Sequence, residues 1–151
     1  MVVASDTVWK AASSEPLTEA KPAVLSFDNG QGLVFRRTIS VDDKFMFTIK
    51  DEVENKSGRD VALTPYGRIY RFGTPKVEGW AILHEGMLGY VGEEKLQEIT
   101  YADLSKEAET NVKNKKPAEA AKRFKPATGG WLGFTDKYWA TALIPPQGQV
   151  Y

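Results

Sequence analysis

The chain has 151 residues, and its 20 lysines and arginines balance its 20 aspartates and glutamates, which fits one ordinary domain. The formal net charge of zero removes the long-range positive field that would attract a nucleic acid or an anionic membrane. The absence of cysteine excludes disulfides, thiolate nucleophiles and sulfur-ligated metals. Because His84 is the single histidine, zinc sites and Ser-His-Asp relays have few candidates, and carboxylates would have to carry any catalysis.

Residues 1–22 are expected to form an extended N-terminal segment with one strand near residues 7–10. From residue 23 the pattern changes to four apolar runs, at 23–27, 33–41, 45–55 and 61–72, which turn-forming residues separate. Leu33, Phe35 and Ile39 share one parity in the second run, as do Phe47, Ile49 and other apolar residues in the third. This alternation predicts strands with one buried face, and the short turns predict an antiparallel meander.

Further short strands are expected at 80–84, 88–91 and 96–101. Residues 107–123 are rich in helix formers but contain Pro117 and lack an apolar face, which predicts a short, solvated helix in a mobile insertion around 103–123. The final aromatic run predicts two strands joined at Thr135-Asp136. The predicted fold class is therefore mostly β, an antiparallel β-sandwich, with residues 23–151 forming one β module in a single domain.

Two polar features have a functional and a structural interpretation. His84 and Glu85 resemble half of an acid–base or metal site, but no second histidine completes HExxH, and neighbours on a strand face opposite ways. A structural, hydrogen-bonding His84 is favoured. The basic residues between 113 and 125 suggest a phosphate or lipid-headgroup patch; a solvated loop is favoured, and the lack of interleaved aromatic residues argues against nucleic-acid binding.

Gly30, Gly32 and the pair Gly129-Gly130 lack the spacing of phosphate-binding loops and are predicted to be turn glycines. Phe134 and three other rings, which lie within nine residues, suggest either core packing or a groove for a sugar or an apolar peptide. About two of the four rings are assigned to the core. The candidate surface-recognition residues are Trp131, Tyr138 and Trp139. No catalytic residue, cofactor site or metal site is predicted.

The segments GGWLGFTDKYWATALIP, WAILHEGMLGYVG and FDNGQGLVFRRTISVDDKFMFTIKDEVEN closely resemble the large periplasmic domain of the bacterial membrane protein insertase family YidC, with an alphaproteobacterial character. The resemblance extends from about Asp6 to the end of the chain. It implies part of a β-supersandwich of the galactose-mutarotase type. About half of that domain is expected here, truncated at both ends and without the family's transmembrane helices.

The resemblance implies a non-catalytic binding and scaffold domain at the periplasmic face of the bacterial inner membrane. It would assist the insertion and folding of inner-membrane proteins, with or without the Sec translocon. The implied partners are SecDF and SecYEG translocon components and nascent inner-membrane proteins, with no nucleic acid and no small-molecule substrate. The alternative is a carbohydrate- or peptide-binding β-sandwich domain, and a carboxylate-only glycosidase is a distant third interpretation.

Overall fold

The computed structural model describes residues 3–4, 6–73, 84–92, 96–114 and 125–150. Within these ranges the chain forms two four-stranded antiparallel sheets and one helix, which confirms the predicted mostly β fold class. The chain divides into two compact units, Met1–Thr64 and Pro65–Tyr151, called unit 1 and unit 2 below. The single-domain organisation with a boundary at residue 22 stays a prediction.

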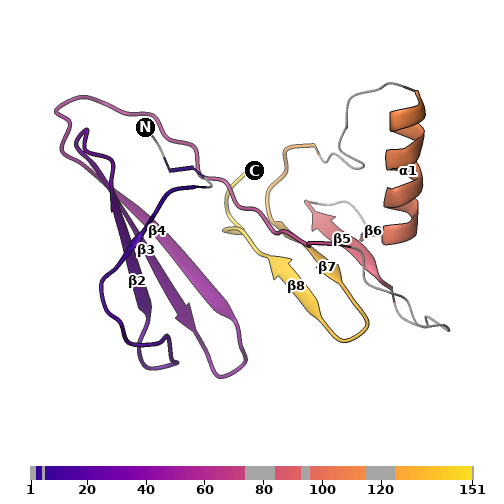
Figure 1. Ribbon diagram of the computed structural model, residues 1–151, viewed down its shortest axis with the longest axis horizontal. Coiled ribbons are helices and arrows are strands. Elements are labelled where there is room, and N and C mark those ends of the chain that lie inside the picture. The colour runs from indigo at the N-terminus through magenta and orange to yellow at the C-terminus, as the bar shows by residue number, and fades with distance from the viewer. Residues whose placement is uncertain (1–2, 5, 74–83, 93–95, 115–124, 151) are drawn as a thin grey trace. The chain divides into compact units, whose positions relative to one another are not determined.

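The sheet of unit 1 contains β1 (Lys10–Ala11), β2 (Ala23–Asp28), β3 (Leu33–Val41) and β4 (Phe47–Asn55), in that order. Figure 1 shows β2, β3 and β4 side by side. The apolar runs at 23–27, 33–41 and 45–55 are thus confirmed as three neighbouring strands. The strand expected near residues 7–10 is only two residues long and begins at Lys10.

The turn between β2 and β3 requires glycine. Gly30 and Gly32 have φ angles of 69° and 86°, which confirms them as turn glycines, because other residues rarely adopt positive φ. A Cβ atom on Gly32 would lie 2.8 Å from the Cα and N atoms of Ser57. The Lys56 amide donates a hydrogen bond of 2.6 Å to the Gly32 carbonyl. The turn therefore packs directly against the backbone that follows β4.

The prediction of a fourth strand at 61–72 is wrong, because no residue of this run belongs to a strand. Pro65 lacks the amide hydrogen that a sheet ladder needs. Gly67 instead lies so close to β8 that a Cβ atom there would be 2.7 Å from Cδ2 of Leu143. The segment that begins at residue 65 therefore packs through small and polar contacts within unit 2.

The sheet of unit 2 contains β5 (Gly86–Val91), β6 (Gln97–Thr100), β7 (Gly130–Thr135) and β8 (Ala140–Leu143). Their order is β6-β5-β7-β8, with every neighbouring pair antiparallel (Figure 1). The run at 88–91 is confirmed as part of β5, and β6 occupies residues 97–100 of the run expected at 96–101. Residues 80–83 of the first expected run lie outside the described residues. The corner between β7 and β8 spans 136–139 instead of 135–136.

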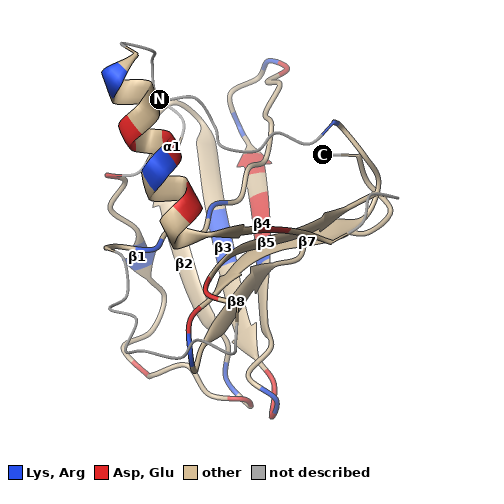
Figure 2. Ribbon diagram, turned by 90° about the vertical axis from the view of Figure 1, so that its right-hand side faces the viewer, with Lys and Arg blue, Asp and Glu red and all other residues tan. Residues whose placement is uncertain are grey.

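The helix α1 (Tyr101–Lys113) follows β6 without a linker, and it begins earlier than the expected start near residue 107. Thr100 caps it, because its Oγ1 accepts a hydrogen bond of 3.1 Å from the Asp103 amide and donates one of 2.7 Å to the Asp103 carboxylate. None of its residues is buried, and charged residues of both signs lie along it (Figure 2). The prediction of a short, solvated helix is confirmed, while residues 115–124 of the expected insertion lie outside the described residues.

Few side chains are fully enclosed. Leu33 and Phe35 in unit 1 are each 7% exposed, and Val91 in unit 2 is 3% exposed. Many large apolar side chains in both units keep a third or more of their area exposed. Among the described residues, no helix combines the length and the apolar character that crossing a membrane requires.

Candidate recognition surfaces

One face of the sheet in unit 1 carries three cross-strand rows. Phe27, Phe35 and Val53 form the first row, Leu25, Arg37 and Asp51 the second, and Ala23, Ile39 and Ile49 the third. Because successive side chains on a strand alternate between faces, these rows share one side of the sheet. We call this side the apolar face of unit 1.

A salt bridge interrupts the apolar face at its middle row. Arg37 contacts Asp51 through two hydrogen bonds, of 2.7 Å from Nε to Oδ1 and 2.8 Å from Nη2 to Oδ2. The Trp9 ring lies 5.3 Å from the Arg37 guanidinium carbon and 6.2 Å from the Phe27 ring. Trp9 therefore covers the β2–β3 side of this face, where it contributes a cation–π contact and ring packing.

The β4 side of the apolar face is open. Phe47 and Ile49 are each 57% exposed and Val53 is 43% exposed. On the opposite side of β4 the side chains are polar or charged. Lys50 donates a hydrogen bond of 2.9 Å to Glu52, which together with the positive charge of Lys50 lowers the pKa of Glu52. Figure 2 shows basic residues on β3 beside acidic residues on β4. The two sides of β4 thus differ sharply in polarity.

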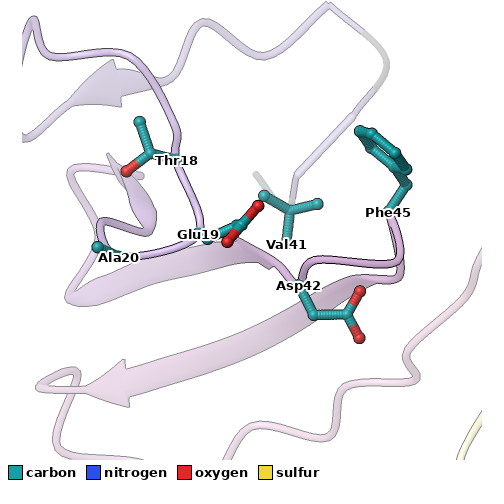
Figure 3. Close-up of a pocket in the computed structure, with 6 residues that line it drawn as sticks. All are labelled: Thr18, Glu19, Ala20, Val41, Asp42 and Phe45. Atoms are coloured by element: carbon teal, nitrogen blue, oxygen red, sulfur yellow. The ribbon is translucent and has the colours of Figure 1, made fainter.

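A shallow hollow of about 420 Å³ lies at the end of β3, lined by Thr18, Glu19, Ala20, Val41, Asp42 and Phe45. Figure 3 shows the Glu19 and Val41 side chains converging, whereas the Asp42 carboxylate points away from that of Glu19. Oδ1 of Asp42 accepts hydrogen bonds from the amides of Lys44 and Met46, each of 2.9 Å. Phe45 has a φ of 60°, an unfavourable conformation for a bulky residue, and its ring is 84% exposed.

The three candidate recognition residues of unit 2 lie in two different settings. Trp131 lies on β7, opposite Tyr90 of β5, and is partly buried like Phe134. Tyr138 and Trp139 are 80% and 79% exposed. They belong to the turn between β7 and β8. Two backbone hydrogen bonds between Asp136 and Trp139, of 2.7 and 3.4 Å, close this turn. The structure brings Tyr138 and Trp139 together and leaves Trp131 within the sheet, and their role in recognition stays a prediction.

Asp136 joins three distant parts of unit 2. Its Oδ2 lies 2.8 Å from Nη2 of Arg71, and its Oδ1 accepts a hydrogen bond of 3.1 Å from the Tyr101 hydroxyl. Partial burial, followed by the hydrogen bond to Asp136 and the charge of Asp136, raises the pKa of Tyr101. Partial burial lowers the pKa of Arg71, but the contacts with Asp136 outweigh this and raise it overall. Sequence reasoning missed this cluster, because no motif relates the three positions.

His84 makes a structural contact, as predicted. Its Nε2 lies 3.2 Å from the Met87 carbonyl oxygen, and its own carbonyl accepts a hydrogen bond of 2.8 Å from the Thr135 hydroxyl. The neighbouring Glu85 has one buried carboxylate oxygen, Oε2, without a hydrogen-bond partner in the described structure. Within the described ranges, no group of three or more metal-ligating side chains converges. These contacts fix the start of β5.

Chemically, these surfaces offer apolar area, aromatic ring faces, an unpaired strand edge and isolated charges. Ring faces and apolar area bind apolar or amphipathic molecules, and a strand edge binds an extended chain. Such surfaces suit recognition of another molecule by shape and burial.

The chain is similar to proteins of one family over its whole length. The family model described as the YidC periplasmic domain matches residues 1–151. The chain is 54% identical over 147 residues to a "Membrane protein insertase YidC" of Methylobacterium sp. (strain 4-46), which covers 97% of the chain and 23% of that relative. It is 53% identical over 143 residues to a protein of the same name from Beijerinckia indica subsp. indica, covering 95% of the chain and 22% of the relative.

The Nitrobacter hamburgensis protein of the same name is 49% identical over 140 residues, which make up 93% of the chain and 21% of the relative. No solved structure matches the chain. The chain thus spans less than a quarter of the length of these alphaproteobacterial relatives. Since the family model covers the chain from end to end, the chain belongs to the YidC periplasmic domain family, as its sequence motifs predicted.

Proposed function

We propose that this chain is a non-catalytic binding and scaffold element of a membrane protein insertase, which assists the insertion and folding of inner-membrane proteins with or without the Sec translocon. The relatives that span its length are named membrane protein insertases. The observation that carries the proposal is the open β4 side of the apolar face, which adjoins a strand edge. Its clients are nascent inner-membrane proteins, and its protein partners are SecDF and SecYEG.

The geometry of β4 supports binding of an extended client. Within the described residues β4 pairs with β3 alone, so its other edge offers backbone donors and acceptors along nine residues. A client strand that pairs with this edge gains backbone hydrogen bonds and places alternate side chains beside Phe47 and Ile49. Burying the exposed halves of these two side chains contributes about 1 kcal/mol each. This favours apolar, extended segments over folded polar surfaces.

Site-specific photo-cross-linking tests the client contact. A photoreactive residue at Ile49, on the apolar face, is placed in the parent insertase and probed with a stalled nascent inner-membrane protein. The matched control carries the same residue at Lys50, which faces the opposite side. Strong cross-links from position 49 and weak ones from position 50 support the proposal. Equal cross-linking at both positions contradicts the preference for the apolar face, and the absence of cross-links at both positions contradicts client binding at β4.

Co-purification tests the Sec partners. The parent insertase is expected to retain SecDF and SecYEG after mild solubilisation, and Ile49→Glu is expected to reduce that recovery several-fold if the apolar face forms the contact. Thr48→Glu adds the same charge to the opposite face and serves as the control. Undiminished recovery with Ile49→Glu would exclude this face as the Sec contact.

A second candidate function is carbohydrate binding at the hollow beside β3. The exposed Phe45 ring and the Glu19 carboxylate are the two kinds of group that hold a sugar, by stacking and by hydrogen bonding. Calorimetric titration with periplasmic oligosaccharides tests it, with Phe45→Ala as the variant expected to abolish the heat of binding. Saturable heat that Phe45→Ala leaves unchanged places the site elsewhere.

A further inference from the structure

A segment of unit 2 presents alternate side chains to the body of the unit and to solvent. Gly67 packs against Leu143 of β8, and Arg71 reaches Asp136 at 2.8 Å, so these two positions face β8 and the turn that precedes it. Tyr66, Tyr70 and Phe72 occupy positions of the other parity and are 71%, 59% and 84% exposed. The alternation turns a row of rings outward.

The outward side chains stack on one another. The guanidinium carbon of Arg68 lies 4.2 Å from the centre of the Tyr70 ring. The Tyr70 and Phe72 rings are stacked, with centroids 5.6 Å apart and planes 13° apart. The outer surfaces of the Tyr70 and Phe72 rings remain in solvent, although burying either ring would be favourable. A cation and two rings thus form an exposed ladder.

A second group of rings lies on the turn that this segment contacts. The salt bridge between Arg71 and Asp136 joins the segment that carries the ladder to the turn between β7 and β8. That turn carries Tyr138 and Trp139, about four-fifths exposed, and Lys137, whose Nζ lies 5.2 Å from the Tyr138 ring. We call the combined set the aromatic–cation surface, made of Arg68, Tyr70, Phe72, Lys137, Tyr138 and Trp139.

The aromatic–cation surface carries surplus positive charge. Asp136 is paired with Arg71, whereas neither Arg68 nor Lys137 forms a salt bridge within the described part of the chain. Two basic groups therefore remain to attract an anionic partner, although the net charge of the whole chain is zero. The attraction is local, and it complements a surface dense in phosphate groups.

The composition and shape of this surface indicate its partner. Tyrosine and tryptophan, with lysine and arginine beside them, are the residues that concentrate at membrane–water interfaces, because their apolar parts enter the headgroup region while their polar ends stay hydrated. The rings stand on a turn and on an extended segment, none of them lines the hollow beside β3, and those of Phe72, Tyr138 and Trp139 are about four-fifths exposed. Rings that project this far suit a deformable lipid interface better than a folded ligand, which needs a concave site.

We propose that the aromatic–cation surface of unit 2 docks on the surface of an anionic phospholipid bilayer, with Tyr70, Phe72, Tyr138 and Trp139 entering the headgroup region and Arg68 and Lys137 contacting phosphates. This surface lies in a different unit from the client-binding strand β4. The tests of lipid docking and of client binding can therefore give different results.

Vesicle flotation with the 151-residue chain tests the docking. The probes are vesicles of phosphatidylglycerol mixed with phosphatidylcholine, and vesicles of phosphatidylcholine alone. We expect the chain to float with the anionic vesicles and to bind the neutral ones weakly. Added salt should weaken binding, because the charge contribution is screened. Failure to bind anionic vesicles at low salt overturns the proposal.

Paired variants locate the contact. Arg68→Gln and Lys137→Gln should each weaken partitioning about fivefold, and Phe72→Ser should weaken it on both kinds of vesicle. Phe45→Ser in unit 1 removes an equally exposed ring and should leave partitioning unchanged. All four positions are solvent-exposed, and circular dichroism checks that the fold persists. Equal losses for Phe45→Ser and Phe72→Ser overturn the assignment of the surface.

Fluorescence gives an independent measurement. Anionic vesicles should shift tryptophan emission to shorter wavelength as Trp139 leaves water, and Trp139→Phe should remove most of that shift while retaining binding through its ring. A shift that persists in Trp139→Phe shows that a different tryptophan meets the lipid and contradicts the proposed orientation.

Discussion

Replacing Gly32 by alanine is expected to destabilise unit 1, and replacing Gly30 by alanine is the matched control. Both glycines lie in the turn between β2 and β3 with positive φ, so both variants incur the strain of a left-handed conformation. The two positions differ in their surroundings. A Cβ atom on Gly32 meets the Ser57 backbone at 2.8 Å, whereas a Cβ atom on Gly30 meets nothing within 4 Å.

The geometry sets the size of each effect. The left-handed conformation destabilises an alanine by about 1–2 kcal/mol. The lower conformational entropy of the unfolded chain offsets about 0.4–1 kcal/mol of this destabilisation. Gly30→Ala should therefore lower the free energy of unfolding by about 0–1.6 kcal/mol. Gly32→Ala adds a clash with backbone atoms, which cannot rotate away, and overpacking of this kind costs about 1–3 kcal/mol more. The total for Gly32→Ala is about 1–4.5 kcal/mol.

Urea unfolding followed by Trp9 emission measures this difference. Trp9 contacts Phe27 and Arg37 in unit 1, and phenylalanine at the three other tryptophan positions confines the signal to that unit. With a slope near 1 kcal/mol/M for a unit of this size, the midpoints of the two variants should differ by about 1–3 M. Equal midpoints, or a lower midpoint for Gly30→Ala, would refute the close approach of this turn to Ser57.

Three further changes test other contacts. Phe45→Asn should raise the free energy of unfolding of unit 1 by about 0.5–1 kcal/mol in urea titration, because asparagine tolerates the positive φ at this turn; a lower value would show that the ring packs somewhere. Asp136→Ala should speed tryptic cleavage after Arg71, because the salt bridge that holds the segment is lost; unchanged cleavage would show that other contacts hold it. The stability of unit 2 should fall as pH rises above about 10, because Tyr101 has a raised pKa in the folded state and the unfolded state loses that proton first. Tyr101→Phe should reduce this slope in alkaline urea titrations, and an identical slope would contradict the prediction.

Local patterns predicted most of the strands and missed the contacts between distant segments. β3 and β4 were predictable because alternate residues such as Phe35 and Ile49 are apolar, and short turns restrict strands to antiparallel pairing. The run at 61–72 has a similar composition, but Pro65 cannot donate to a ladder, and this breaker outweighs the β-branched and aromatic residues around it. Its contacts with β8 have no signature in the sequence.

The start of the helix was within reach of sequence reasoning. Thr100 followed by Asp103 has the spacing of an N-terminal cap, and this signal places the start at Tyr101, ahead of the stretch richest in helix formers. The Asp136 cluster was out of reach. Asp136, Arg71 and Tyr101 are 30 or more positions apart in the sequence, and the fold of unit 2 alone brings them together. Sequence reasoning assigned about two of the four neighbouring rings to the core, and it did not predict the turn that exposes both Tyr138 and Trp139.

The position of Asp51 limits how copies of this chain can associate. Asp51 is the central residue of β4, so two β4 strands that paired antiparallel in full register would set one Asp51 directly opposite the other. Like charges at such cross-strand positions repel, although each Asp51 carboxylate keeps its salt bridge with the Arg37 of its own copy. A symmetric dimer through paired β4 edges is therefore unfavourable, as inward-pointing charges on edge strands oppose aggregation. A partner strand with a lysine or arginine at that register avoids the repulsion, so Asp51 favours pairing with a different protein over pairing with a second copy of this chain.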